Sequence, residues 1–425
     1  METNFTLIEH SFIYAKKDAE ETKKGDSNIA VSQKVFEEIK AFVLKNVEEK
    51  DNSVVNFLIP GYAKGFGEIL KAKNYVGVIQ TKKGITIEIL PKIYSDLKQS
   101  ENPKDEIAET KKIFLKMLRT LKKSPFKISN YANLDLSKMP LLDIFINMFL
   151  VELSVLVKQG LRKDYIPKSE NLFTLKGKLD FNKNIKHNFA HKERFFVNYD
   201  EFDANRPENK LIKSTLLFLS KKATSNSTQQ KVRKFSFVFD EISPSKNIDV
   251  DLEKCSSNRL TYHYEKILAW CRIFLKNQSF SNYKGKDLAF ALLFPMERIF
   301  EDFVAHQLRK HHSIQTQKTI GSLLIEPDKY KMKPDIVFSD KNIIADTKWK
   351  ILDEKHQMTQ SDLYQMFAYG THPKRNIKDT ERIILIYPKT PNFPEKKEYQ
   401  FSEELLLEIF PYDLVDENNN EKLLE

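Results

Sequence analysis

The sequence predicts a mixed α/β protein of several domains: a β-rich module at residues 1–100, a mainly helical middle region at 101–286, and a domain at 287–425 with a mixed sheet flanked by helices. Three observations support this prediction. The 425 residues suggest about three domains of roughly 150 residues each. Short apolar runs separated by turns occur in the first region, and apolar residues at helical spacing occur in the second. In the last region strand patterns and helix patterns alternate, as in α/β sheets.

The charge and the residue usage exclude several classes of protein. Lys and Arg number 69 and Asp and Glu 59, so the net charge is +10, which favours a polyanionic partner without requiring one. Only 11 residues are glycine, and the sequence has no glycine-rich phosphate-binding loop. The chain is therefore expected to have no nucleotide site of its own, so another subunit would supply any nucleotide hydrolysis. Two cysteines, Cys255 and Cys271, are too few for a disulfide framework or a cysteine-rich zinc module.

We expect a cytoplasmic protein with no membrane contact. Residues 1–10 lack the basic and then apolar order of a signal peptide. The most apolar stretch, Leu141 to Val157, is interrupted by Asp143, Asn147 and Glu152. This stretch is therefore predicted to be a buried helix rather than a membrane span.

In the first region we expect one helix and several strands. Apolar residues recur at helical spacing from Val35 to Val47. Two apolar runs, Val76 to Gln80 and Ile85 to Leu90, flank a turn in which Gly84 permits the positive φ that a tight hairpin needs.

In the middle region the patterns predict both strands and helices. The strands are expected around Phe173 to Asp180 and Phe195 to Tyr199, and the helices from Asn209 to about Lys222 and from Tyr264 to Lys276.

The C-terminal region predicts the order helix, three strands, helix, strand. Such a mixed sheet needs cover on both faces, and the two helices are placed to supply it. The expected elements are a helix from Leu288 to about Lys310, strand material up to Glu326, strands Pro334 to Phe338 and Ile343 to Trp349 joined by the turn 339–342, a helix from about Thr359 to Tyr369, and a strand Ile383 to Pro388.

The short turn between the two central strands determines which residues face each other. If Phe338 pairs with Ile343, Asp335 lies directly opposite Asp346. Side chains alternate along a strand, so Asp346 and Lys348 share one face. Facing antiparallel positions have Cβ atoms about 4.5–5.5 Å apart. Two carboxylates and one ammonium group are therefore expected to converge.

This convergence predicts a metal-dependent phosphodiesterase centre made of Asp335, Asp346 and Lys348. Two carboxylates this close repel each other, and a divalent cation removes the conflict. A small number of hard oxygen ligands suits Mg²⁺, with Mn²⁺ possible, rather than zinc. Such an ion activates water and neutralises charge on a phosphate, and the lysine adds a fixed positive charge. The alternative is a hairpin with ordinary surface charges, which the flanking apolar strands and the following helix disfavour.

At these residues the sequence resembles a known family. Pro334-Asp335, Asp346-Thr347-Lys348 and the surrounding element order resemble the PD-(D/E)xK nuclease superfamily. More closely, several segments resemble the McrC family, the nuclease subunit of McrBC-type modification-dependent restriction systems. The resemblance covers most of the chain. The segments are Gly77 to Ile79, Glu88 to Lys92, Asn198 to Phe202, Glu297 to Val304, Lys333 to Val337, Ala345 to Lys350 and Asp362 to Gly370.

The resemblance implies a role for each site residue. Both aspartates would bind Mg²⁺, and Lys348 would complete the catalytic centre. Glu301, on the first helix of the C-terminal region, would project towards the metal as a further ligand. Gln365 and Tyr369 lie one helical turn apart, like the Q-x-x-x-Y element of RecB-type nucleases, and would support the site by reaching the metal's water or the DNA backbone. The alternative for this pair is a helix that packs on the sheet with a hydrogen-bonded glutamine.

The resemblance also implies a function: a Mg²⁺-dependent endonuclease subunit of an antiviral restriction system, which hydrolyses DNA phosphodiester bonds. Its partner would be a hexameric AAA+ GTPase of the McrB kind that recognises and translocates DNA and is bound by residues 1–100. Two alternatives stay open. A stand-alone PD-(D/E)xK nuclease of phage defence or repair would cut DNA without a partner. A non-catalytic DNA-binding or ring-activating scaffold would keep only the fold.

Overall fold

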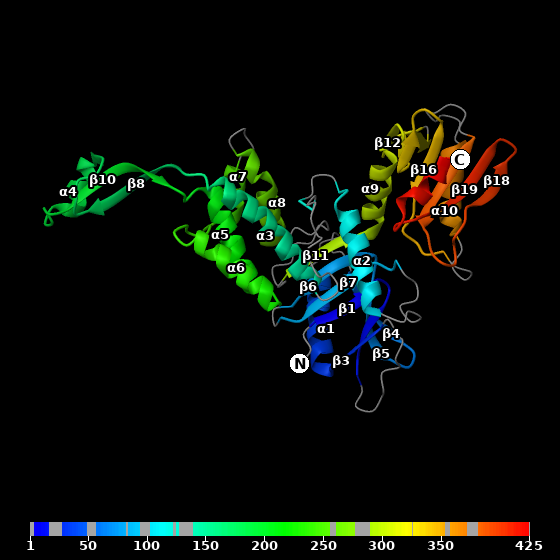
Figure 1. The fold of residues 1–425 in the computed structure, drawn as a ribbon, viewed down its shortest axis with the longest axis horizontal. Coiled ribbons are helices and arrows are strands. Elements are labelled where there is room, and N and C mark those ends of the chain that lie inside the picture. The colour runs from blue at the N-terminus through cyan, green and yellow to red at the C-terminus, as the bar shows by residue number, and fades with distance from the viewer. Residues whose placement is uncertain are drawn as a thin grey trace. The chain divides into compact units, whose positions relative to one another are not determined.

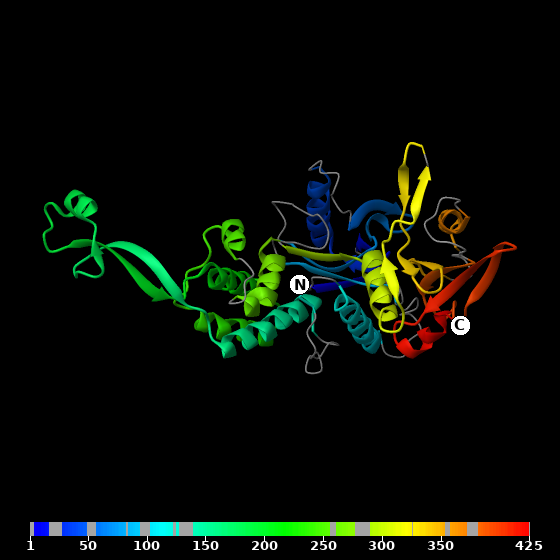
Figure 2. The ribbon, with the colours of Figure 1, turned by 90° about the horizontal axis from the view of Figure 1, so that it is seen from above.

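In the computed structural model the chain forms two compact units, Met1–Leu141 with Ser279–Glu425, and Leu142–Gln278 (Figures 1 and 2). The structure describes residues 4–16, 28–48, 57–81, 84–93, 103–121, 125–126, 139–255, 261–276, 290–324, 326–352, 358–371 and 381–424. The predicted domain boundaries near residues 100 and 286 lie outside these ranges, so the division into three domains stays a prediction. The mixed α/β class is confirmed.

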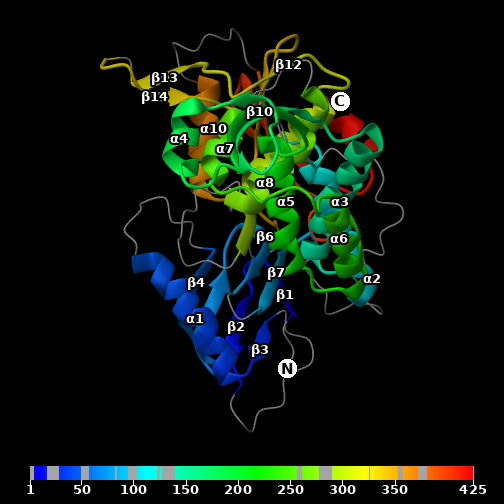
Figure 3. The same cartoon turned by 90° about the vertical axis from the view of Figure 1, so that its left-hand side faces the viewer.

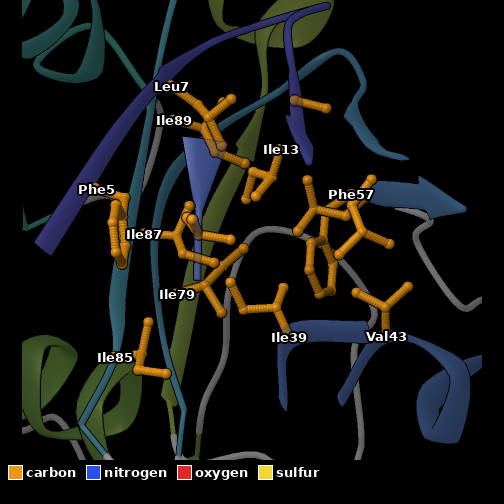
Figure 4. Packing of buried hydrophobic residues seen from close by; sticks show 14 of the residues in the cluster. Phe5, Leu7, Ile13, Ile39, Val43, Phe57, Ile79, Ile85, Ile87 and Ile89 are labelled. Carbon is orange, nitrogen blue, oxygen red and sulfur yellow. The ribbon is translucent and has the colours of Figure 1, made fainter. Parts of the chain in front are cut away.

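Two four-stranded sheets and helix α1 (Gln33–Glu48) form the N-terminal part of the first unit (Figure 3). One core of apolar side chains joins them, with Phe5 and Ile87 from the first sheet, Ile13 from the second and Ile39 from α1 (Figure 4). The first sheet pairs β1 (Asn4–Ile8), β7 (Thr86–Leu90), β6 (Tyr75–Gln80) and β11 (Phe290–Pro295), and the second pairs β3 (Ile29–Val31), β2 (Phe12–Ala15), β5 (Gly67–Ala72) and β4 (Leu58–Ala63), in these orders.

The predicted helix and hairpin of this region are confirmed. The apolar stripe that starts at Val35 lies in α1 and is buried against the sheet. Strands β6 and β7 are antiparallel, with Gln80 opposite Thr86, and Gly84 in the turn has φ 89°.

The predicted helix from Leu288 is wrong in its first part. Its start lies outside the described residues, and Phe290–Pro295 is strand β11, antiparallel to β6. Helix α9 (Met296–Leu308) begins only after Pro295. A continuous apolar run suits a fully buried strand as well as a buried helix, and its periodicity does not separate the two. Strand β11 belongs to the N-terminal sheet, and helix α9, which follows it directly, leads on to the C-terminal sheet.

The second unit combines packed helices with a three-stranded antiparallel sheet. Strands β8 (Asp164–Leu172) and β10 (Phe195–Asp203) pair antiparallel along 9 residues each. The predicted strand at Phe195 is confirmed. The one around Phe173 to Asp180 is mostly wrong, because β8 ends at Leu172 and only the two residues Lys178 and Leu179 of the predicted range form a strand. The predicted helices from Asn209 and Tyr264 are confirmed. The remaining elements are β9 (Lys178–Leu179), α4 (Phe181–Asn188), α5 (Pro207–Ser220), α6 (Asn226–Val238), α7 (Ile248–Lys254), η1 (Tyr262–Tyr264) and α8 (Glu265–Lys276).

Helix α3 (Leu141–Gln159) is the predicted helix, and it is buried from Leu141 to Leu150, whereas Val151 and Val155 are 43% and 46% exposed. Its polar interruptions have partners within the second unit. The Asp143 carboxylate accepts hydrogen bonds from the backbone N–H groups of Thr224 (3.1 Å) and Ser225 (3.0 Å), at the start of α6. Asn147 Nδ2 donates to Thr228 Oγ1 at 2.9 Å. Among the described residues no helix is long and apolar enough to cross a membrane.

A six-stranded mixed sheet in the order β12-β15-β16-β17-β19-β18 forms the C-terminal part of the first unit. Its central strands are buried on both faces: Ile344 packs with Met366 of α10, and Ala345 is buried on the opposite face. Two strands, β18 and β19, were not predicted. The elements are β12 (Ile314–Thr316), β15 (Ile336–Phe338), β16 (Ile343–Thr347), α10 (Gln360–Thr371), β17 (Arg382–Pro388), β18 (Lys397–Ser402), β19 (Leu405–Tyr412) and η2 (Glu417–Leu424); α2 (Pro103–Leu118) contacts α9.

The predicted register of the central hairpin is confirmed. Phe338 pairs with Ile343, and Ile336 pairs with Ala345. Strand β15 begins one residue after Asp335, and β16 ends at Thr347. The two aspartates therefore lie at the open end of the hairpin.

Candidate active site

A polar pocket of about 770 Å³ lies at the open end of the β15–β16 hairpin. Helix α9 contributes Glu301, the segment after β12 contributes Gln317, and α10 contributes Asp362. Asp335 and Lys348 come from the hairpin itself. The fold thus brings five polar side chains from four separate segments to one cavity.

Asp335 is fixed by the strand opposite it. Its Oδ2 accepts hydrogen bonds from the backbone N–H (2.8 Å) and the hydroxyl (2.7 Å) of Thr347. The carboxylate thereby satisfies a backbone donor at the end of β16, where an unpaired donor would be costly. This double contact holds Asp335 in one orientation.

Asp346 and Lys348 form an ion pair, in which Lys348 lines the pocket and Asp346 is buried. Asp346 is 1% exposed, and its Oδ2 lies 2.5 Å from Lys348 Nζ. Burial, followed by the charge of Asp335, raises the pKa of Asp346 to about 6, while Lys348 opposes the rise. Burial disfavours a charged lysine, but the Asp346 carboxylate outweighs it and raises the pKa of Lys348. The lysine is therefore an ammonium at neutral pH.

Helix α10 orients this ammonium. Lys348 Nζ donates to Gln365 Oε1 at 2.9 Å, and Gln365 Nε2 donates to the Tyr369 hydroxyl at 2.8 Å. The Tyr369 hydroxyl donates to the Lys333 carbonyl at 3.3 Å, and burial raises its pKa to about 12. The glutamine is thus hydrogen-bonded in a packed helix, as the packing alternative expects, and its partner is the candidate catalytic lysine.

Gln317 bridges two carboxylates. Its Nε2 donates to Glu301 Oε1 at 2.7 Å and to Asp335 Oδ1 at 2.9 Å. Burial, followed by the charge of Asp335, raises the pKa of Glu301 to about 7. Gln317 has φ 52°, in the left-handed region that residues other than glycine rarely adopt. Such strain is typical of positions held in place for their side chain.

A second ion pair borders the pocket. Lys350 Nζ donates to Asp362 Oδ1 and Oδ2 at 2.9 and 2.7 Å, and the Tyr387 hydroxyl donates to Oδ2 at 3.2 Å. Burial opposes ionisation of Asp362, but the contact with Lys350 lowers its pKa below the ordinary value. The pair holds a second lysine beside Lys348.

Trp349, between the two lysines, connects the hairpin with the N-terminal sheet. Its Nε1 donates to both carboxylate oxygens of Glu9, at 2.9 and 3.0 Å, and its ring centroid lies 5.4 Å from that of Phe300. Glu9 follows β1, is 1% exposed, and also accepts from the backbone N–H of Lys92 at 3.2 Å. Burial raises the pKa of Glu9 to about 7.

The donor set suits a hard divalent cation better than zinc. Among the described residues no three His, Cys, Asp or Glu side chains are close enough to hold a metal ion by themselves. A zinc site takes at least three such ligands, whereas Mg²⁺ is commonly bound by one or two carboxylates and keeps several waters. Asp335 and Asp346 supply such a pair. The raised pKa values of Asp346 and Glu301 fit crowded carboxylates whose repulsion a cation would relieve.

All the predicted site residues lie in one connected network. The Asp335 backbone N–H donates to Asp346, which connects the two halves of the network. Their catalytic roles stay predictions. In order, the connected residues are Glu301, Gln317, Asp335, Asp346, Lys348, Gln365 and Tyr369.

Several participants were not predicted from the sequence. Gln317 and Glu9 lie outside every motif, and no local pattern identifies them. Lys350 and Asp362 lie inside the resembling segments, where a search for oppositely charged pairs between strand and helix would have found them.

These observations define a mixed α/β chain with an acidic pocket that contains a half-buried lysine. A family model described as McrBC 5-methylcytosine restriction system component matches residues 70–388. The chain belongs to this family, and the resemblance to McrC is confirmed.

Relatives and solved structures agree with this membership. The type IV methyl-directed restriction enzyme EcoKMcrBC of Escherichia coli K12 is 23% identical over 272 residues, which are 58% of this chain and 77% of the relative. The refined half-complex from a tetradecameric assembly of Thermococcus gammatolerans McrB AAA+ hexamers with bound McrC contains a chain with TM-score 0.67 and 19% identity. That match covers 97% of this chain and 95% of the solved one, so the two share their fold.

Proposed function

We propose that this chain is the Mg²⁺-dependent DNA endonuclease subunit of a McrBC-type restriction system. It hydrolyses DNA phosphodiester bonds in complex with an AAA+ GTPase hexamer of the McrB kind, which recognises and translocates the DNA. The observation that supports this proposal most directly is the network from Glu301 to Tyr369 around one pocket, in a chain of this family.

In the proposed reaction a water oxygen bonds to phosphorus, one P–O ester bond breaks, and the leaving oxygen takes up a proton. Mg²⁺, or Mn²⁺, held by Asp335 and Asp346 would activate water and offset phosphate charge. Glu301, which shares Gln317 with Asp335, would act through the water around the ion rather than as a third carboxylate ligand. Lys348 is kept as an ammonium by Asp346 and is oriented by Gln365. Its charge stabilises the negative charge that builds up on the phosphate oxygens.

The proposed partner follows from the family and from the division of labour. The 425 residues contain no phosphate-binding loop, so the GTPase site belongs to another chain. The solved structure that matches nearly the whole chain is one in which McrC is bound to McrB hexamers. By analogy this chain binds such a hexamer, with residues 1–100 as the proposed contact.

The test compares Asp346→Asn with Asp340→Asn. Both changes remove one carboxylate charge from the same hairpin, but Asp340 is exposed in the turn at its far end. Asp346→Asn should reduce single-turnover DNA cleavage by about 10²-fold or more, because the charge that pairs with the cation and Lys348 is lost. It should also weaken Mn²⁺ binding in the absence of DNA. Asp340→Asn should change neither quantity, and both variants should stimulate the partner's GTPase normally.

Three other outcomes would contradict the proposal. Cleavage retained by Asp346→Asn would move the catalytic centre elsewhere. Efficient cleavage by the pure chain without partner or GTP would favour the stand-alone nuclease. A wild-type chain that stimulates the GTPase but neither binds Mn²⁺ nor cuts DNA would be the scaffold.

A further inference from the structure

A two-stranded ribbon projects from the C-terminal sheet beside the pocket. Strands β13 (Gly321–Leu324) and β14 (Lys329–Met332) pair only with each other among the described strands, and they extend away from the six-stranded sheet (Figures 2 and 3). The base of the ribbon is anchored, since Ile320 and Met332 lie in the C-terminal core and Ile320 N–H donates to the Met332 carbonyl at 3.0 Å. Beyond this base, most of its side chains are exposed.

Both ends of the ribbon lead into the candidate active site. Gln317 lies before β13, and Asp335 lies three positions after the end of β14. Gln317 donates to Asp335 twice, from its side chain to Oδ1 (2.9 Å) and from its backbone N–H to the backbone carbonyl (3.1 Å). A polymer whose backbone lies in the pocket therefore lies next to the base of the ribbon.

The ribbon carries lysines and exposed apolar surface. Residues 318–334 contain four lysines and two acidic residues: Lys318 and Lys333 lie at its base, and Lys329 and Lys331 lie in its outer part together with Glu326 and Asp328. Lys329 and Lys331 are exposed on either side of Tyr330, which is 69% exposed; Leu324, opposite Lys329, is 43% exposed. Tyr330 has φ 60°, a conformation that is costly for a tyrosine and is typical of functional positions. Lys331 also contacts Asp328, so part of its charge is balanced within the ribbon.

This chemistry fits double-stranded DNA. The major groove, about 12 Å wide and about 8.5 Å deep, admits a two-stranded β-ribbon, whereas the minor groove is about 6 Å wide. A strand of four residues spans roughly 13 Å, enough to reach the floor of the major groove. Lysines on a ribbon contact the phosphates on both sides of the groove, and apolar side chains contact base edges and thymine methyl groups.

We propose that the β13–β14 ribbon enters the major groove of the duplex whose backbone occupies the pocket, with Lys329 and Lys331 on phosphates and Tyr330 against base edges. This inference rests on the proposed nuclease function and assigns the element that holds the substrate. Recognition by the ribbon adds to whatever the partner recognises.

The test uses the full-length chain, a 30-base-pair duplex, and Ca²⁺ in place of Mg²⁺ so that the duplex is not cut. The variant Lys329→Gln/Lys331→Gln is compared with Lys341→Gln/Lys397→Gln, which removes the same charge from exposed positions in the β15–β16 turn and edge strand β18. Each lost phosphate contact lowers the slope of log affinity against log salt by about 0.9. The ribbon variant should therefore lose nearly two units of slope, and the control variant should keep the wild-type slope.

A second measurement tests the groove. Dimethyl sulfate modifies guanine N7 in the major groove and adenine N3 in the minor groove. Wild-type protein should protect N7, and Tyr330→Ala should reduce that protection while leaving the salt slope unchanged. Protection of adenine N3 alone would overturn the assignment to the major groove.

The remaining outcomes separate this inference from the proposed function. If the wild type binds and, with Mg²⁺ and partner, cuts DNA while the ribbon variant keeps the wild-type slope, the inference is wrong and the nuclease function stands. If the ribbon variant instead loses GTPase stimulation or changes the oligomeric mass, the ribbon contacts protein. If the wild-type chain neither binds nor cuts DNA, both proposals fail.

Discussion

At the scale of single residues, Lys348 decides the electrostatics of the pocket. It is the direct cationic partner of Asp346, which is buried beside a second carboxylate. We expect Lys348→Met to reduce single-turnover cleavage by about 10²-fold or more. The ammonium would no longer stabilise the charge that builds up on the phosphate, and Asp346 would lose its cationic partner. The pKa of Asp346 should rise further, so residual activity should need a higher pH than that of the wild type. A variant with wild-type rate and pH profile would remove Lys348 from the mechanism.

Gln365 and Tyr369 allow the packing and supporting roles to be separated. Tyr369→Phe keeps the buried ring but removes the hydroxyl that holds Gln365 Nε2, at a cost of about one hydrogen bond, 0.5–1.5 kcal/mol. Cleavage should fall by about 3- to 10-fold, and by more in Gln365→Leu, with the melting temperature of Tyr369→Phe little changed. Tyr364→Phe, on the exposed side of the same helix, is the control. If Tyr369→Phe and Gln365→Leu cut DNA as fast as the control Tyr364→Phe, Gln365 and Tyr369 would serve only in packing the helix.

The predictability of the site residues follows from how far apart their partners lie in sequence. Asp335, Asp346 and Lys348 could be placed from sequence because one short turn and the alternation of strand side chains determine their positions. Gln317 could not, since its role depends on a left-handed backbone conformation and on a helix residue 16 positions earlier. Glu9 could not either, because its partner is 340 positions away.

At the scale of elements, the pairing of β6 with β11 depends on one glycine. Gly77 has φ 142°, and a Cβ added there would lie 2.0 Å from the Leu292 carbonyl oxygen. We expect Gly77→Ala to destabilise the first unit by about 3 kcal/mol or more, through backbone strain and separation of the strands. In Gly61→Ala the nearest atom to the new Cβ is Ile69 Cγ1 at 3.6 Å, so the cost should be within about 1 kcal/mol. Calorimetry of the two variants checks this, and equal melting temperatures would contradict it.

The same strand marks the limit of prediction for elements. Hairpins and amphipathic helices such as β6–β7 and α1 were predictable, because local turn chemistry and helical spacing specify them. Strand β11 was not, because its six residues are apolar on both faces and its partner strand lies more than 200 positions earlier. A fully buried strand has no alternation to reveal it, so only the tertiary contact selects strand over helix.

At the scale of the whole molecule, the contact between Glu9 and Trp349 makes the nuclease motif depend on the N-terminal sheet. Trp349 lies between Lys348 and Lys350 in the sequence, so a shift of its indole that displaces the backbone also moves both lysines. Removal of the carboxylate in Glu9→Leu would leave the buried indole N–H without its acceptor, at a cost of about 1–3 kcal/mol. Glu9 and Trp349 therefore connect the N-terminal sheet directly with the segment that carries the two lysines of the pocket.

The raised pKa of Glu9 makes this contact testable through pH. The pKa of Glu9 in the folded state is about 7, above the ordinary 4.5, and burial is the main cause. The hydrogen bonds from Trp349 and from the Lys92 backbone N–H and the charge of Lys92 lower the pKa, whereas the charge of Glu297 raises it. His10 Nε2 lies 3.6 Å from Glu9 Oε1. The stability contributed by the protonated carboxyl is fully present below about pH 4.5 and is lost as the pH rises through 7. The difference corresponds to roughly 3 kcal/mol.

Glu9→Gln keeps an acceptor for the indole but cannot ionise. We therefore expect its stability relative to wild type to increase by up to about 3 kcal/mol between pH 4.5 and pH 8, whereas Glu403→Gln, at an exposed position, should show no such trend. Denaturant titrations at several pH values measure this, with Trp349 fluorescence in a Trp270→Phe background reporting on the contact itself. Because the amide preserves the hydrogen bond, cleavage should survive in Glu9→Gln and fall in Glu9→Leu. Equal cleavage by both variants would mean that the contact stabilises the fold without positioning Lys348.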